Sequence, residues 1–225
     1  LVGGDWQGSN GVLQATYTTV EKDTLIDASS KGIGDGGKIV VWSDIHNANS
    51  KTVAQGKLYA TANVGDGGKI ETSGYALNIE NVDPNTSSVQ GLYGEFLIDP
   101  YDYEIDSTAW SNINTSLKTT NVSISTGSSN TSYGSSDSTD DSGTITFLSG
   151  NRIYDQNREA TLTLTADNIE FDANISTTSR KLHITANADK VEGAGNLNLG
   201  GGILKVNVSE MGSDLSGVIS GTNTA

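Results

Sequence analysis

The sequence predicts an all-β protein, a right-handed parallel β-helix whose coils stack into a solenoid. Three observations lead to this prediction: short runs of alternating apolar and polar residues, spacings of 20 and 22 residues between similar runs, and few large apolar residues. We expect one β-helical segment over residues 1–225, with loop excursions at 80–96 and 125–143.

The alternating runs dominate the second half of the chain. They are Leu162–Leu164, Ile169–Phe171, Leu182–Ile184, Leu197–Leu199 and Val206–Val208. Alternate side chains of an extended chain share a face, so each run has one apolar and one polar stripe. Asn, Asp, Ser and Gly, which favour turns, separate the runs. Because no window keeps helical apolar spacing over three turns, the pattern predicts strands and almost no helix.

The spacing indicates a repeat. Leu162, Leu182 and Leu204 follow one another at 20 and 22 residues, and the motif of Gly34–Ile39 recurs at Gly65–Ile70, a shift of 31 residues. Periods of roughly 20 to 50 residues are typical of repeat architectures. An immunoglobulin-like sandwich also has short, regularly spaced strands. We favour the β-helix, because Asn10-Gly11 is the only Asn-Gly hairpin dipeptide.

The composition fits a thin solenoid. Leu, Ile, Val and Phe number 50 of 225 residues, about 22%, whereas Ser and Thr number 52; this lies just above the range of charged chains that stay disordered. A stacked coil needs few large side chains, since its neighbours close the core.

Charge and residue content exclude several classes of protein. The net charge of −14 disfavours a nucleic-acid partner. The longest apolar run, Ile39–Trp42, is too short for membrane insertion or a signal peptide. With no Cys, thiol catalysis and cysteine-ligated metals are excluded. We expect no cofactor and no metal.

Two segments are candidate functional sites. Asp102, Glu104 and Asp106 would share one face of an extended strand beside Asp99, as carboxylates do in polysaccharide-acting β-helices. We interpret them as a solvated strand face and expect no enzyme. Residues 125–143 form a polar loop without aliphatic side chains. Its candidate contact residues are Tyr133, Asp137, Asp140 and Asp141.

Five motifs in order resemble the exoproteins of two-partner secretion, the filamentous-haemagglutinin-like family that includes the high-molecular-weight adhesins. The motifs are Gly3–Gly8, Ile26–Ser29, Gly34–Asp44, Gly67–Gly74 and Leu97–Asp102. Residues 1–105 contain all five motifs, and the remaining residues share only the alternating pattern of the family. The Asn-Pro-Asn motifs of the family's secretion domain are absent, so we expect a segment from just beyond that domain.

The resemblance implies a secreted or cell-surface protein of a Gram-negative bacterium, exported through an outer-membrane β-barrel transporter. We expect an adhesin segment that attaches to a host cell-surface protein or glycan. Capture of a host haem carrier, an inert stalk and a polysaccharide-acting enzyme are the alternatives. Trp6 and Trp42 lie in the shared motifs and are expected to pack the first coils. Trp110 lies outside them and is expected in the core or at a cap.

The resemblance also gives weight to the Asn-x-Ser/Thr sequons, because high-molecular-weight adhesins are glycosylated at such sites. Asn85, Asn114 and Asn130 lie in segments that resemble loops and are the expected acceptors. Asn121, Asn174 and Asn207 lie in or beside expected strands.

Overall fold

The computed structural model describes residues 1–126, 143–209 and 213–220, and these residues are mostly strands. Every strand pairing among them is parallel. The prediction of an all-β protein is confirmed. The immunoglobulin-like alternative does not fit, because such sandwiches are built from antiparallel sheets.

The elements follow one another as short strands and then longer ones. The first part contains the 3-10 helix η1 (Trp6–Gly8) and the strands β1 (Tyr17–Val20), β2 (Leu25–Asp27), β3 (Ser30–Ile33), β4 (Lys38–Trp42), β5 (Lys51–Ala54), β6 (Lys57–Tyr59), β7 (Ala62–Val64), β8 (Lys69–Gly74), β9 (Ala76–Asn78) and β10 (Asp83–Asn85). The second part contains β11 (Glu95–Pro100), β12 (Tyr103–Ile105), α1 (Ser107–Ser116), β13 (Asn121–Ser125), β14 (Thr144–Tyr154), β15 (Ala160–Thr177), β16 (Leu182–Gly193), β17 (Leu197–Asn198), β18 (Leu204–Val208), β19 (Asp214–Leu215) and β20 (Ile219–Ser220).

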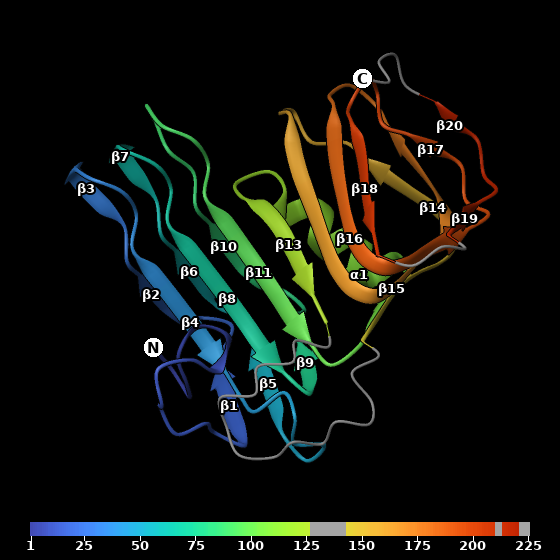
Figure 1. Ribbon diagram of the computed structural model, residues 1–225. Coiled ribbons are helices and arrows are strands. Elements are labelled where there is room, and N and C mark those ends of the chain that lie inside the picture. Colours follow the sequence, from blue (N-terminus) through green and yellow to red (C-terminus); the bar gives the residue numbers. More distant parts are fainter. Residues whose placement is uncertain (127–142, 210–212, 221–225) are drawn as a thin grey trace.

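The strands form one large sheet and three small ones. The 12-stranded sheet runs β12-β14-β15-β13-β11-β8-β4, and β16 to β20 are joined to it through β15. The small sheets are β1-β5-β9, β10-β6-β2 and β3-β7. Figure 1 shows the parallel strands side by side, with the N-terminal strands on the left and the C-terminal strands on the right.

The core consists of rows of apolar side chains that pass from strand to strand. One row contains Ile39, Ile70, Phe96, Val122, Leu162, Ile184 and Leu204. Its first six members are almost completely buried. Phe147 and Phe171 stack in the same core with their ring centroids 5.0 Å apart. Burying each such side chain contributes about 1.5–3 kcal/mol.

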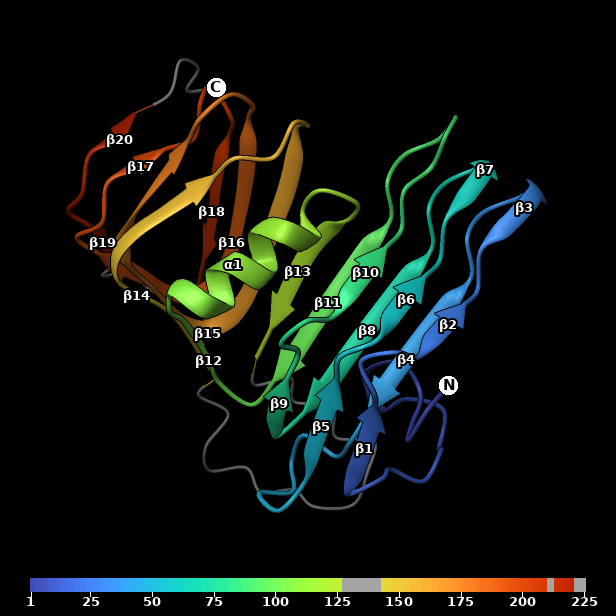
Figure 2. The ribbon, with the colours of Figure 1, turned by 180° about the vertical axis from the view of Figure 1, so that it is seen from behind.

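Helix α1 was not expected from the sequence. Asp106 caps it by accepting a hydrogen bond from the backbone N–H of Ala109 at 2.7 Å. Trp110 and Ile113 are buried, and the Trp110 indole donates to the carbonyl of Ile153 at 2.9 Å. Figure 2, the view from behind, shows α1 crossing in front of β13 and β15. Helix α1 is the one α-helix among the described residues, and the expected burial of Trp110 is confirmed.

The segment 80–96 differs from the expected loop excursion. Within it, β10 pairs in parallel with β6, and Ser88 forms an isolated bridge with Ala62. Pro84 fits because β10 is the outer strand of its sheet, where a missing N–H is tolerated. Residues 80–96 are therefore largely part of the stack. No helix among the described residues has the length and apolar character needed to cross a membrane.

Glycines allow the coils to approach one another at the corners. A Cβ atom on Gly67 would lie 1.7 Å from the carbonyl oxygen of Thr86, and one on Gly36 would lie 2.1 Å from that of Ala60. Neither contact is sterically possible. Gly32 in β3 differs, because a Cβ atom there would meet nothing within 4 Å. The repeated Gly-Asp-Gly-Gly motif is thus explained by the distance between coils.

We expect Gly67→Ala to lower the free energy of unfolding by about 1–3 kcal/mol, the typical effect of overpacking. The added methyl group would force the 86–94 turn away from Gly67. Gly32→Ala is the matched control and should change stability by no more than about 0.5 kcal/mol. Urea unfolding followed by circular dichroism measures both. Equal losses for the two variants would contradict the close-approach explanation.

Candidate functional site

The outward face of β4, β8 and β11 is buried, although outward faces of a stacked coil normally meet solvent. Val40 lies opposite Glu71, Trp42 opposite Ser73, and Ser73 opposite Asp99. Each of these five side chains is 2% exposed or less. This face therefore combines apolar packing with two buried carboxyl groups.

The chain before β1 covers part of this face, and we call residues 2–14 the N-terminal strap. Val2 pairs with Val41 at the edge of the large sheet. Trp6 packs against the cluster of Val40, Trp42 and Ile45. The Trp42 indole donates a hydrogen bond to the side-chain oxygen of Gln14 at 2.9 Å. The expectation that Trp6 and Trp42 pack the first coils is confirmed.

Two lysines flank the strap. The ammonium groups of Lys38 and Lys69 lie 5.5 and 5.4 Å from the Trp6 ring centroid, within the range of cation–π attraction. Lys69 also pairs with Glu95, with 3.7 Å between nitrogen and oxygen. The lysines therefore hold Trp6 from the solvent side of the sheet.

Glu71 connects the strap to the sheet. Both of its carboxyl oxygens accept from the backbone N–H of Gln7, at 3.0 and 3.1 Å, and the hydroxyl of Ser73 donates to Oε1 at 3.1 Å. Gln7 adopts a left-handed backbone conformation with φ of 48°. A non-glycine residue in this region is strained, so the hydrogen bond to Glu71 compensates for a locally unfavourable backbone.

Asp99 has fewer hydrogen-bond partners than Glu71. It lies diagonally across the strand pair from Glu71 on the same face, and neither of its side-chain oxygens has a hydrogen-bond partner. A buried polar group without a partner destabilises a fold, and a buried charge does so more strongly. The structure therefore favours the neutral carboxylic acid at this position.

Both acids have shifted proton affinities. Burial, followed by the charge of Asp99, raises the pKa of Glu71 to about 8; the hydrogen bonds from Gln7 and Ser73 and the charge of Lys38 act in the opposite direction. Burial raises the pKa of Asp99 to about 7. The pair can consequently retain protons near neutral pH.

A substrate cannot reach the carboxyl groups of Glu71 and Asp99, because both residues are 0% exposed. A calcium site of the usual kind needs six to eight oxygen ligands. Within the described ranges, no group of three or more His, Cys, Asp or Glu side chains is arranged to hold a metal ion. The buried pair Glu71 and Asp99 is suited to retaining protons, and Glu71 also binds the strap through Gln7.

The structure separates the acidic residues that the sequence suggested as one cluster. Asp99 is buried, whereas Asp102 accepts a hydrogen bond from the backbone N–H of Thr144 at 2.9 Å. Glu104 is exposed in β12, and Asp106 caps α1. The shared face expected for Asp102, Glu104 and Asp106 does not form, because the strand ends at Ile105.

The sequons differ in their surroundings. Asn85 lies in β10 and Asn114 in α1, so the expectation that both lie in loops is wrong. The Asn114 amide donates to Asp155 at 2.7 Å, and the Asn85 side-chain oxygen accepts from the backbone and hydroxyl of Ser87. Asn130 lies outside the described residues, as do Tyr133, Asp137, Asp140 and Asp141.

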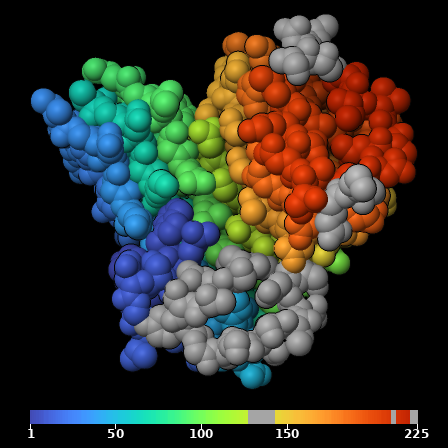
Figure 3. All heavy atoms as spheres, viewed as in Figure 1, coloured from blue at the N-terminus to red at the C-terminus, as the bar shows by residue number. Residues whose placement is uncertain are grey.

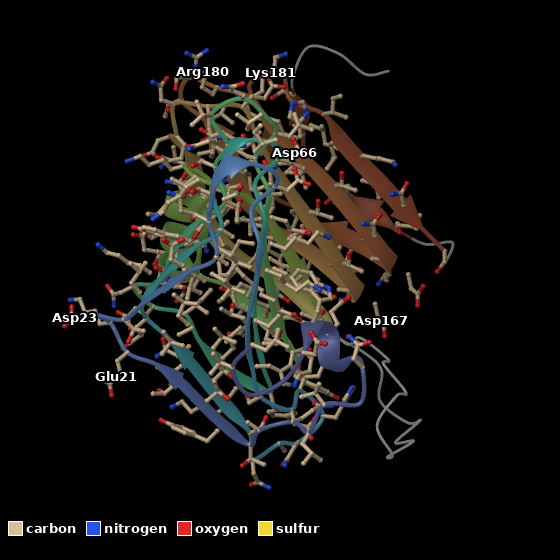
Figure 4. The ribbon with its side chains drawn as sticks, turned by 90° about the vertical axis from the view of Figure 1, so that its left-hand side faces the viewer. Glu21, Asp23, Asp66, Asp167, Arg180 and Lys181 are labelled. Atoms are coloured by element: carbon tan, nitrogen blue, oxygen red, sulfur yellow. The ribbon has the colours of Figure 1, made fainter. Side chains whose placement is uncertain are left out.

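Two other polar features lie on the surface: a contact between His183 and Glu159, and a pocket near Glu21. His183 lies in β16, and its Nε2 lies 2.7 Å from a carboxyl oxygen of Glu159. A shallow pocket of about 550 Å³ is lined by Thr19, Glu21, Lys22, Asp23, Thr24 and Gln55. Figure 4 shows Glu21 and Asp23 projecting outward from this corner. These carboxylates point into solvent.

Sequence reasoning missed the role of Glu71. Alternation with Ile70 correctly places its side chain on the outward face, where an acid is ordinarily solvated. The available signal was an acidic residue, Glu71, within the shared motif Gly67–Gly74. The strap residue that bonds to it, Gln7, lies 64 residues earlier in the sequence.

No protein-family model, no curated protein and no solved structure matches this chain significantly.

We expect the free energy of unfolding to fall as pH rises from about 4 to about 8. Glu71 and Asp99 keep protons in the folded state that the unfolded chain releases near its ordinary values of 4.5 and 3.8, so their stabilising contribution is lost as pH rises through the folded pKa values. Asp99→Asn should reduce this slope, because it removes one titration and the repulsion at Glu71. Urea unfolding at intervals from pH 5 to 8.5 measures the slope.

Asp27→Asn is the control for this experiment. Asp27 is exposed, and hydrogen bonds from Ser29 lower the pKa of its carboxyl group, so its titration lies below the measured window. A slope in Asp99→Asn equal to those of the wild type and the control would show that Asp99 is ionised in the folded protein.

Proposed function

We propose that this chain is a segment of a non-enzymatic, secreted or surface-exposed bacterial adhesin, in which a right-handed parallel β-helical spine presents a surface for attachment to host cells or matrix. The resemblance of residues 1–105 to two-partner-secretion exoproteins supports this origin, with export through an outer-membrane β-barrel transporter. The arguments that follow concern the spine and then the attachment surface.

The regular contacts between coils support a β-helical spine. Side chains bond to the next coil at sequence separations of 31 residues for Asp35 and Asp66, 22 for Asn174 and Asn196, and 20 for Asn187 and Asn207. Each coil therefore covers the preceding one. Crossover connections between parallel strands of one sheet are right-handed in about 98% of cases, which favours the right-handed form.

The attachment surface is an apolar patch on three stacked turns, which we call the wing patch: Ile33, Val64, Val89 and Leu92. Ile33 pairs with Val64, and the backbone N–H groups of Val89 and Leu92 bond to Ala62 and Asp66 of the preceding turn. Ile33 is 92% exposed, Val89 78% and Leu92 74%. Figures 1 and 2 both show β3, β7 and the following turn projecting together from the body.

The wing patch is the observation that carries the proposal. Contiguous exposed apolar side chains with a polar rim mark interaction sites more often than isolated ones do. Figure 3 shows that this region forms one side of a hollow, with the later coils on the other side. A solenoid provides such concave surfaces through its curvature. A host protein or glycan could therefore contact the patch and the adjoining polar coil.

We expect the purified chain to bind epithelial cells, and the triple variant Ile33→Ser, Val89→Ser, Leu92→Ser to bind about tenfold less, which corresponds to a loss of 1.4 kcal/mol. Flow cytometry with fluorescently labelled protein measures the binding. The control is the double variant Leu13→Ser, Val218→Ser, whose original side chains are 88% and 67% exposed outside the wing patch. Equal binding by all three proteins would exclude the wing patch.

A second variant tests the sequence-based prediction of a contact loop. It combines Tyr133→Ala with Asp137→Asn, Asp140→Asn and Asp141→Asn. Reduced cell binding by this variant alone would place attachment at that loop. A pull-down with immobilised protein separates the functions: recovery of a serum haem carrier favours nutrient capture. If the wild type binds no cell or serum component, the adhesion and nutrient-capture functions are excluded, and the chain is an inert stalk.

We also propose glycosylation of at least one sequon among Asn85, Asn114 and Asn130. Intact-mass measurement of protein from its native source should show hexose increments, and substitution of the modified Asn by Gln should remove them. Asn121→Gln serves as the control, because Asn121 lies in β13 and its side chain bonds to Tyr93, Arg158 and Thr161. A native mass equal to that of the unmodified chain would refute this proposal.

A further inference from the structure

We propose that Glu71 and Asp99 form a proton-retaining pair that locks the N-terminal strap onto the sheet, and that loss of their protons loosens the strap around Trp6 and Gln7. This inference concerns a pH-sensitive device in the first coils. It is independent of the proposed attachment function and requires no ligand.

The positions of Glu71 and Asp99 make the strap sensitive to the charge of these two residues. Glu71 is on β8 and Asp99 on the adjacent β11, and the two lie on the same face one pair of residues apart. The two are close enough for the charge of Asp99 to act on Glu71. Both are fully buried. Two ionised carboxylates here would repel each other at low effective dielectric.

The strap supplies the only backbone N–H in the described residues that bonds to Glu71. Its donor is Gln7, whose left-handed conformation is strained. Because Gln7 lies within η1 next to Trp6, movement of this donor also affects the packing of Trp6. The Val2–Val41 pairing is held by backbone hydrogen bonds of Val2 with Val40 and Trp42 and is expected to remain intact.

The surrounding charges do not neutralise the pair. Lys38 on β4 comes last among the causes that shift the pKa of Glu71, and its ammonium group lies over the Trp6 ring. Lys69 on β8 also lies over Trp6 and pairs with Glu95 of β11. On the strap, Asp5 bonds to Asn10 and Trp6 and carries a negative charge at neutral pH. Deprotonation therefore leaves uncompensated negative charge beneath the strap.

The direction of the response follows from the proton balance. In acid, both carboxyl groups are neutral, and a Glu71 oxygen still accepts from Gln7. Each group that ionises releases one proton to solvent and leaves a charge that favours solvation over burial. The hydrogen bond from Gln7 favours ionised Glu71, but burial has the larger effect on the pKa of this group. Raising the pH thus shifts the equilibrium from a docked towards a loosened strap, whereas lowering it restores docking. The remainder of the stack has its own apolar rows and stays folded.

The test is fluorine NMR of protein labelled with 5-fluorotryptophan, in which Trp6, Trp42 and Trp110 give separate signals assigned by single Trp→Phe variants. We expect the Trp6 signal to shift or broaden between pH 6 and 9, with Trp110 unchanged. The double variant Glu71→Gln, Asp99→Asn should abolish the Trp6 response. Hydrogen exchange of residues 1–14, corrected for the intrinsic effect of pH, should increase over the same range only in the wild type.

Two further variants keep the outcome decisive. Glu71→Gln alone preserves an acceptor for Gln7 and tests the pair if the double variant does not fold. Glu104→Gln is the matched control, since Glu104 is exposed in β12. A Trp6 signal that stays constant from pH 5 to 9 would overturn the proposal, as would an equal response in the wild type and both Glu71 variants. Neither result depends on cell binding.

Discussion

The structure depends on parallel hydrogen bonding between successive coils. Each described strand bonds to parallel neighbours, and none pairs with an antiparallel strand. A coil therefore cannot satisfy its backbone groups alone. This requirement fixes the separation between coils, and it explains why Gly36 and Gly67 have no room for a side chain.

Residues at equivalent positions of neighbouring strands differ in chemical type and in burial. One outward row contains Val40, Glu71, Leu97, Ser123, Thr163, Thr185 and Lys205. Its first three members are buried, the next three are half-buried and the last is exposed. Backbone geometry is the same along the row, so the change must come from what covers the face. In the first coils, part of that cover is the N-terminal strap, and it turns a polar position into a buried acid.

Alternation and spacing were sufficient to predict the strands, because Leu162, Leu164, Leu182 and Ile184 follow the simplest rule of extended chains. The helix α1 was missed, since its Ser, Thr and Asn residues are weak helix formers and only Asp106, Trp110, Ile113 and Leu117 mark its cap and buried side. The buried pair was missed for another reason. Local pattern shows which face Glu71 occupies, but the cover on that face comes from residues distant in sequence.

Buried acids are costly, and a fold retains them only where other interactions determine the structure around them. Here the apolar row from Ile39 to Ile184 continues directly beneath Glu71 and Asp99, so the sheet does not depend on the pair. The strap has less support, since its contacts include only one strand bridge, at Val2, besides the packing of Trp6 with its two lysines and the hydrogen bonds at Gln7 and Gln14. Changes in the charge of the pair should therefore affect the strap before the stack. Local opening occurs where few buried contacts oppose it.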